Sequence, residues 1–267
     1  MRVEILALGA LLLASATAGA TDLSPCQGET SDKAIAACSQ IIEDPAASQQ
    51  DKAAAYVARS FHYEQRSLYK EALADANAAI GLNVTDPVIY DNRSNAERML
   101  DMLDAAFADA NEALRRDPND MPALLNRGLV YLARKEYSDA IADFSRFIAS
   151  NDTASEPFTF RAETFAESGQ LDRAFSDYAA SIRIGQDGAR PYLGRARIYL
   201  GQKNYPLALA DYEAALKLQP DSSYALFGRG LVKLQSGDQN GGRADMDAAL
   251  KQDPAIVKRF YNVPYDR

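Results

Sequence analysis

The sequence predicts an all-α protein built as a solenoid of stacked helical repeats, and three observations support this. Arginine recurs at a step of 34 residues, aspartate recurs at the same step, and small residues recur in the same register. A fixed period of this length is typical of arrays in which each repeat packs only against its neighbours. We call the two charged series the ladder: Arg59, Arg93, Arg127, Arg161, Arg195 and Arg229, with Asp75, Asp109, Asp143, Asp177, Asp211 and Asp245.

Residues 1–20 have the layout of a secretory signal peptide. Arg2 precedes an apolar run from Ile5 to Leu13, and Ala18-Gly19-Ala20 supplies the small residues of a cleavage site. The run is too short for a membrane-spanning helix, which needs about 20 apolar residues. We therefore expect a periplasmic or secreted protein, with no stable membrane insertion after cleavage. An N-terminal helix that is not removed is the alternative.

Residues 21–52 are expected to form an N-terminal capping segment. Cys26 and Cys38 are the only two cysteines, and an isolated pair in an exported protein predicts a disulfide. A disulfide that closes so short a loop stabilises a fold by about 2–3 kcal/mol. Residues 31–43 carry the pattern of a lone second helix that covers the first repeat. A zinc site is disfavoured, because the spacing matches no zinc motif.

Residues 53–256 divide into six blocks of 34 residues, each predicted to form two amphipathic helices. Small residues at the eighth and twentieth places of each block let its helices approach closely, and proline near the end of a block stops the second helix. Gly169 and Gly237 mark turns between helices. The blocks begin at Ala53, Pro87, Met121, Ser155, Ala189 and Ser223. Residues 257–267 are expected to form a short C-terminal cap and tail.

This pattern resembles the tetratricopeptide repeat family over residues 53–256. Segments such as 125–131 and 139–144 are similar to those of exported repeat proteins of alphaproteobacteria, in which a cysteine-containing segment often precedes the repeats. The resemblance implies a right-handed superhelix whose first helices line a concave groove. It also implies a protein or peptide partner and no enzymatic activity.

The groove is the place where we expect a partner to bind. A lining rich in leucine and phenylalanine suits an apolar or amphipathic segment of another protein. The alternative is that several of these side chains belong to the core. Leu129 and Phe160 are expected near the centre of the groove. The candidate groove residues are Phe61, Met99, Leu125, Leu129, Leu132, Phe160, Glu163, Arg197, Leu200, Phe227 and Leu231.

The ladder is expected to brace the stack through repeated ion pairs, because arginine and aspartate occur together in all six blocks. A row of sites for a charged ligand is the alternative, and the sequence leaves open whether each pair forms within a block or between blocks. Some members of the family hold a C-terminal carboxylate in the groove with basic residues. Acids at Asp91 and Glu156 disfavour that mechanism here, because they would repel a carboxylate.

Other function classes find little support. The net charge is −8 with no basic stripe, which disfavours nucleic acid. His62 is the only histidine and is expected on a helix surface, so a nucleophile–histidine pair is improbable. No phosphate loop, dinucleotide fingerprint or metal motif occurs, and no cofactor is expected. The sequence favours an exported scaffold in envelope assembly or secretion; the alternative is an accessory protein for envelope glycan binding or processing.

Overall fold

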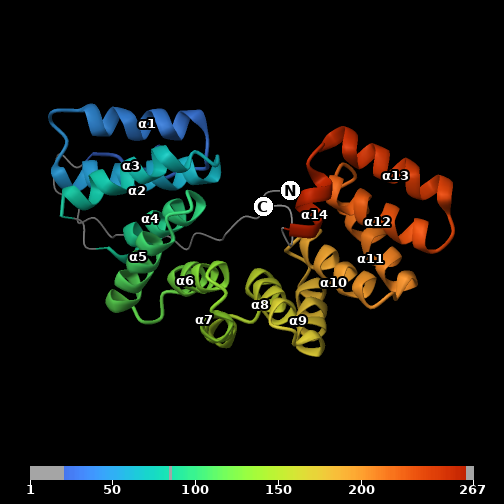
Figure 1. Cartoon of the computed structure of the whole chain (residues 1–267). Helices are drawn as coiled ribbons and strands as arrows, with labels where there is room; N and C mark the ends of the chain where they lie inside the picture. The colour runs from blue at the N-terminus through green and yellow to red at the C-terminus, as the bar shows by residue number, and fades with distance from the viewer. Residues whose placement is uncertain (1–20, 84–85, 263–267) are drawn as a thin grey trace. The chain divides into compact units, whose positions relative to one another are not determined.

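The computed structural model describes residues 21–83 and 86–262, and these residues form fourteen helices (Figure 1). The expected signal peptide and residues 263–267 of the tail lie outside the described residues. The all-α prediction is confirmed. The helices are α1 (Asp32–Glu43), α2 (Gln49–Gln65), α3 (Tyr69–Gly81), α4 (Pro87–Met99), α5 (Leu103–Arg116), α6 (Met121–Ala133), α7 (Tyr137–Ser150), α8 (Glu156–Glu167), α9 (Leu171–Ile184), α10 (Arg190–Gly201), α11 (Tyr205–Leu218), α12 (Ser223–Gln235), α13 (Gln239–Gln252) and α14 (Ile256–Asn262).

The helices pack in consecutive pairs within two compact units, which meet in the sequence at residues 143 and 144 inside α7. In the N-terminal unit α2 pairs with α3 and α4 pairs with α5. In the C-terminal unit the pairs are α8 with α9, α10 with α11, and α12 with α13. First helices of successive blocks also touch, α2 with α4 and α4 with α6 in one unit, α8 with α10 and α10 with α12 in the other.

Several first helices begin at a side chain that caps their free backbone N–H groups. The oxygen of Ser48 accepts a hydrogen bond from Asp51 N at 3.0 Å, and that of Asp120 accepts one from Ala123 N at 3.2 Å. Such caps satisfy donors that the helix itself leaves unpaired. Helices α4, α6, α8 and α10 carry proline in the first turn, where its missing N–H costs nothing.

The turn between the two helices of each block has a left-handed residue at its fifteenth place. Glycine fills that place at Gly169 and Gly237, as the sequence indicates. The other four blocks use residues with a Cβ, for which the left-handed region costs roughly 1–2 kcal/mol. These are Ser67, Asp101, Lys135 and Lys203, with φ values of 59°, 62°, 61° and 58°.

Small residues bring the two helices of a block into close contact, as predicted. The hydroxyl of Ser60 donates to the carbonyl oxygen of Ala72 at 3.1 Å, a contact possible only where the two backbones nearly touch. A Cβ added to Gly230 would lie 2.9 Å from the carbonyl oxygen of Gly242. The eighth and twentieth places therefore mark the crossing point of each helix pair.

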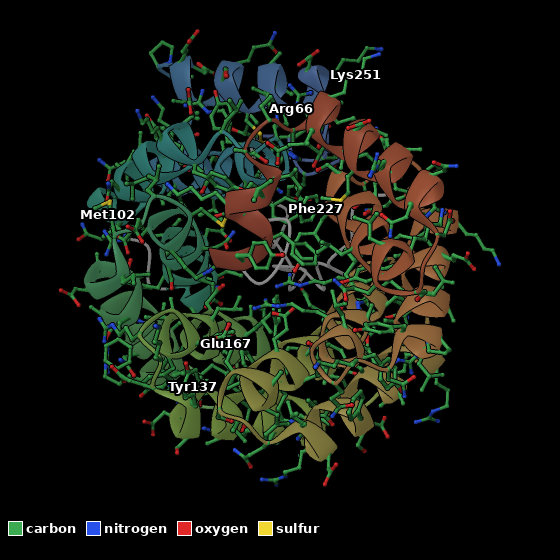
Figure 2. All side chains as sticks on the ribbon, turned by 45° about the vertical axis from the view of Figure 1, so that its right-hand side comes forward. Arg66, Met102, Tyr137, Glu167, Phe227 and Lys251 are labelled. Carbon is green, nitrogen blue, oxygen red and sulfur yellow. A yellow bond between two sulfur atoms is a disulfide. The ribbon has the colours of Figure 1, made fainter. Side chains whose placement is uncertain are left out.

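Helix α14 covers the end of the C-terminal unit. The ring of Phe260 lies 4.7 Å from that of Tyr224 and 5.1 Å from that of Phe227, measured between centroids. Phe227, labelled in Figure 2, belongs to α12, and this helix packs against α14. The aromatic residues at the end of the last block are therefore buried by the protein's own chain.

Candidate partner-binding surface

The structure pairs each ladder arginine with the aspartate of its own block. Arg127 Nε and Nη2 donate to the two carboxylate oxygens of Asp143 at 2.7 and 2.8 Å. The same two-pronged geometry occurs in the other five blocks. The hydrogen bonds that Arg127 donates to Asp143 raise the pKa of the guanidinium. The planar guanidinium matches a carboxylate in this way, which lysine cannot do.

In blocks two to four the third nitrogen of the arginine reaches the block before it. Arg127 Nη1 donates to Asn111 Oδ1 at 2.8 Å, and Arg161 Nη1 donates to Ser145 Oγ at 2.9 Å. Arg59 has no preceding block, and its Nη1 donates to Ser39 of α1 at 2.7 Å. Helix α1 therefore supplies the hydrogen bond that a preceding second helix supplies elsewhere. One arginine thus braces its own block and joins it to its neighbour.

The ladder is a structural element and leaves little room for a ligand. Its aspartates are between 5% and 8% exposed, and both oxygens of each are occupied. Aromatic rings also lie against several arginines; the ring centroid of Tyr131 is 5.9 Å from the guanidinium carbon of Arg127. A charged ligand would have to displace these contacts.

The N-terminal segment is tied to α1 and α2 by a disulfide and by the single histidine. Cys26 and Cys38 form a disulfide, and no cysteine of the chain is free. His62 is 2% exposed; Nε2 lies 2.7 Å from the carbonyl oxygen of Cys26, and Nδ1 lies 3.1 Å from Thr30 Oγ1. The expectation that His62 lies on a helix surface was therefore wrong. His62 thus hydrogen-bonds Cys26 and Thr30, which lie in the non-helical segment before α1.

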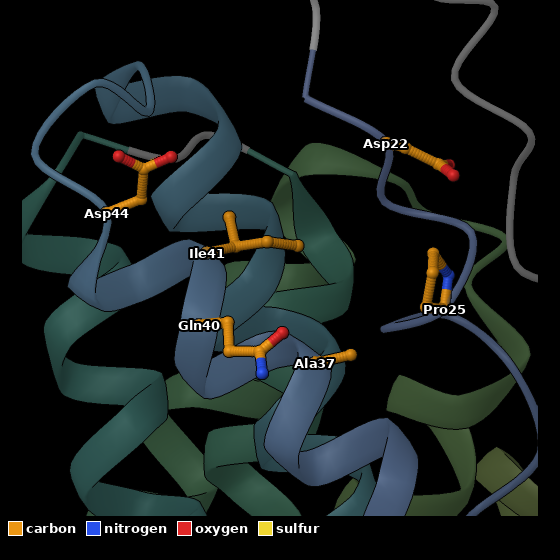
Figure 3. Close-up of a pocket in the computed structure, with 6 residues that line it drawn as sticks. All are labelled: Asp22, Pro25, Ala37, Gln40, Ile41 and Asp44. Carbon is orange, nitrogen blue, oxygen red and sulfur yellow. The ribbon is translucent and has the colours of Figure 1, made fainter.

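Figure 3 shows a small pocket beside this segment. It has a volume of about 190 Å³, with Asp22 and Pro25 on one wall and Ala37, Gln40, Ile41 and Asp44 on the other. Small-molecule sites usually enclose about 300–1,000 Å³ and are mostly apolar. This pocket is too small and too open to serve as the functional site.

In the N-terminal unit the candidate groove residues remain partly accessible. Phe61 of α2 and Leu125, Leu129 and Leu132 of α6 are half-buried, and Met99 of α4 is 39% exposed. They occupy the fifth, ninth, twelfth and thirteenth places of their blocks, which face one side of consecutive first helices. We call this side of the first helices the groove face.

In the C-terminal unit two candidate groove residues are buried instead. Phe160 is 5% exposed; its ring stacks on Phe144 at 5.8 Å, and the guanidinium of Arg190 covers it at 4.4 Å. Phe227 is 2% exposed beneath Phe260. Both are core residues and cannot serve as open anchors, which corrects the expectation from the sequence. Arg197, Leu200 and Leu231 stay half-buried.

Glu163, also predicted in the groove, belongs to a buried ion pair. It is 3% exposed, and Arg190 Nε and Nη2 donate to its two oxygens at 2.7 and 2.9 Å. Burial opposes the charge of Arg190, but Glu163 outweighs this and raises the pKa of the guanidinium. The pair joins α8 to α10 and neutralises a carboxylate that has little access to water.

A larger pocket, of about 340 Å³, lies on the first helices of the C-terminal unit. Glu167, labelled in Figure 2, and Arg197 place opposite charges on it, while Leu171 and Ile198 are apolar. Gly194 and Gly201 also line it. This combination suits a peptide side chain better than a catalytic step.

The sequence singles out Asp91 as an acid, but it does not predict that the structure gathers this residue and two other acids of the N-terminal unit into a strip. The strip consists of Glu64 of α2, Asp91 of α4 and Asp120 at the start of α6, and we call it the acid strip. Burial and the neighbouring Asp120 raise the pKa of Asp91 to about 9, and burial raises the pKa of Glu64 to about 8. The sequence contains an indication of this strip, because the corresponding places of most other blocks carry no acid.

The described residues contain no other chemistry that suggests an enzyme. No group of three or more histidine, cysteine, aspartate or glutamate side chains in residues 21–83 and 86–262 could hold a metal ion. None of the described helices is long and apolar enough to cross a bilayer. The groove face is the remaining candidate for function.

Two sequence models, both of tetratricopeptide repeats, match the chain. One matches residues 100–155 and the other residues 195–259, so both fall inside the six blocks. No curated protein matches the chain by sequence.

Solved structures of repeat proteins share the fold. A tetratricopeptide repeat protein from Parabacteroides merdae has a TM-score of 0.68 at 20% identity, covering 86% of this chain and 90% of its own. Pseudomonas aeruginosa pilF has a TM-score of 0.67 at 14% identity, covering 80% and 96%. YrrB, described as having an unusual peptide-binding site, has a TM-score of 0.51 at 17% identity, covering 70% and 96%. Likeness at these identities shows the fold alone.

Proposed function

The chain is a tetratricopeptide repeat protein, and on that premise we propose that it is an exported scaffold that binds a protein or peptide segment on its groove face. Proteins of this family are interaction scaffolds, and their fold is typically not catalytic. The role we propose is in envelope assembly or secretion.

The accessible apolar side chains of the N-terminal unit carry this proposal. Leu125, Leu129 and Leu132 stand one helical turn apart on α6, and Phe61 and Met99 add apolar surface from α2 and α4. A partner with apolar side chains at matching spacing would remove this surface from water, which favours binding by about 25 cal/mol per Å². The mixed charges beside it would set specificity.

A pull-down with a matched pair of variants tests the binding face. Leu129→Glu places a charge on the groove face, and Leu207→Glu places the same charge on α11, where the side chain is already 45% exposed. We expect Leu129→Glu to weaken binding of a partner by about 30-fold, because interface energy concentrates in a few central sites. Leu207→Glu should bind as the wild type does.

The partner would be captured from periplasmic extract, identified by mass spectrometry and then measured in purified form. Equal affinity of both variants, with unchanged melting curves, would place binding away from the groove face. Retention on envelope polysaccharide with no protein partner would instead favour the glycan-accessory alternative.

Export is supported by the pattern of residues 1–20 and by the Cys26–Cys38 disulfide, since such bonds persist in oxidising compartments. Expression of the whole chain in a Gram-negative host should yield a periplasmic protein that begins at Thr21. Its mass should lie two hydrogens below that of the reduced form. A protein that retains Met1 in the cytoplasm would contradict export.

A further inference from the structure

The acid strip brings three carboxyl groups together on consecutive first helices. Asp91 is 4% exposed, and the negative charges of Asp120 and Glu64 act on its carboxyl group. Glu64 lies near the same group, and its Oε2 accepts a hydrogen bond from Asn95 Nδ2 at 3.0 Å. The strip thus runs from α2 across α4 to the start of α6.

Three side-chain oxygens of these acids have no hydrogen-bond partner among the described residues. They are the two carboxyl oxygens of Asp91 and Oε1 of Glu64. Arg98 acts on Glu64 and donates to Asn95 Oδ1 at 2.8 Å. A buried polar group without a partner costs about 1–3 kcal/mol.

The C-terminal unit shows how the same fold neutralises a buried acid. There Glu163 has its own cation, because the second place of its neighbouring block is Arg190. The corresponding second places in the N-terminal unit are apolar, at Ala54, Val88 and Pro122. Val88 is 39% exposed, so this second place is open to solvent.

We infer that the acid strip is the subsite for a basic side chain, lysine or arginine, of the partner segment. This rests on the proposed function, and it gives the partner a chemistry: a basic residue flanked by apolar residues that meet Phe61 and Leu125. The partner's cation takes the role that Arg190 has in the other unit. An acidic segment or a free C-terminal carboxylate does not fit, because it supplies no positive charge to stabilise the ionised form of these buried acids.

Three labelled peptides, acetylated and amidated at their ends, serve as probes with the whole mature chain. They alternate leucine with lysine, with glutamine or with glutamate, and binding is followed by fluorescence anisotropy. We expect the lysine peptide to bind at least tenfold more tightly than the glutamine peptide, and the glutamate peptide to bind most weakly. Asp91→Asn with Asp120→Asn should remove most of the lysine preference, measured as the ratio of the affinities for the lysine and glutamine peptides.

The matched control removes two acids elsewhere in the same unit, with Glu71→Gln and Asp139→Asn on exposed positions of second helices. If the control loses the lysine preference equally, the preference reflects the net charge and the inference is overturned. If the lysine and glutamine peptides bind equally, the acid strip is not a subsite, although the groove face still binds peptides. If no peptide binds, the proposed function itself fails.

Discussion

Two glycines of the C-terminal unit lie in helix interiors because an aromatic ring occupies the space of a side chain. A Cβ on Gly194 would lie 2.4 Å from the hydroxyl of Tyr178, and one on Gly228 would lie 2.3 Å from the ring of Tyr212. Both tyrosines are fully buried. Each ring thus packs into the backbone of the next first helix, which joins successive blocks through shape alone.

This contact predicts that Gly228→Ala destabilises the protein, although alanine is normally the better helix former. We expect a loss of about 1–3 kcal/mol, because the methyl group would force the Tyr212 ring or the helix to move. Urea unfolding measures it. The control is Gly201→Ala in α10, where no atom lies within 4 Å of the added Cβ. Equal stability of the two variants would contradict the packing argument.

Glu97 is a second residue whose effect on the free energy of unfolding can be measured. In most blocks its place, the eleventh, holds an aromatic ring against the ladder arginine, but here a carboxyl group that is 7% exposed faces Asp109. Burial and the charge of Asp109 raise the pKa of Glu97 to about 7. Between its ordinary value near 4.5 and 7, the folded protein keeps a proton that the unfolded chain releases. Stability therefore falls as pH rises through this window.

Glu97→Gln should remove this pH dependence, because the amide has no proton to lose. At pH 8 we expect the variant to be more stable than the wild type by on the order of 1–2 kcal/mol, and at pH 4 the two should be alike. Urea unfolding at both pH values gives the difference. The exposed Glu71→Gln should follow the wild type; a similar gain in that variant would assign the effect to net charge.

At the scale of the helices, the ladder combines two functions in one side chain. The fork of Arg127 holds α6 to α7 through Asp143, and its remaining nitrogen holds α6 to α5 through Asn111. A double-mutant cycle separates the two contacts. Arg127→Ala with Asp143→Ala should show a coupling of about 0.5–3 kcal/mol, as contacting residues do.

The cycle with Asn111→Ala should show a smaller coupling, because a single hydrogen bond contributes about 0.5–1.5 kcal/mol. The exposed Asp139 is the matched control for Asp143, and its replacement should be additive with that of Arg127. Additive energies in the Asp143 cycle would mean that the ion pair contributes nothing beyond its separate side chains.

The same elements show what the sequence could and could not predict. The 34-residue step predicted the helix pairs, their close crossings and the arginine–aspartate series, because these depend on residues within one repeating unit. It left the second contact of the arginine unspecified, since the acceptor is serine in α1 and α7 and asparagine in α3 and α5. Periodicity identifies a recurring place, but not a partner whose identity changes.

Two of the errors lie at the ends of the array, where a block lacks a neighbour. The tenth place is buried and apolar in several blocks, as at Ala96, Val130 and Val232, yet His62 was assigned to the surface. The position of His62 at the tenth place of its block is therefore the feature of the sequence that indicates its burial. The sequence predicts Phe227 in the groove, because no pattern in it indicates that Phe260 covers the ring. End effects require knowledge of what packs against the terminal blocks.

At the scale of the whole molecule, a stack of repeats should transmit a local loss of stability only to nearby helices. The cap offers a direct test. Replacing Cys26 and Cys38 by serine removes the covalent link between the N-terminal segment and α1, at a cost of about 2–3 kcal/mol to the structure that it closes. We expect amide hydrogens of α1 and α2 to exchange about 30- to 150-fold faster in this variant.

Helices α12 and α13 should keep their exchange rates, because they belong to the other compact unit and pack against α14. Hydrogen exchange measured by mass spectrometry resolves the two regions in one experiment. Ser39→Ala provides a milder control, since it removes only the hydrogen bond from Arg59 to α1. Faster exchange in α12 and α13 to the same extent as in α1 would show that the array unfolds as one cooperative unit. Unchanged exchange in α1 would show that the disulfide does not hold the cap, and that His62 with the hydrogen bonds around it suffices.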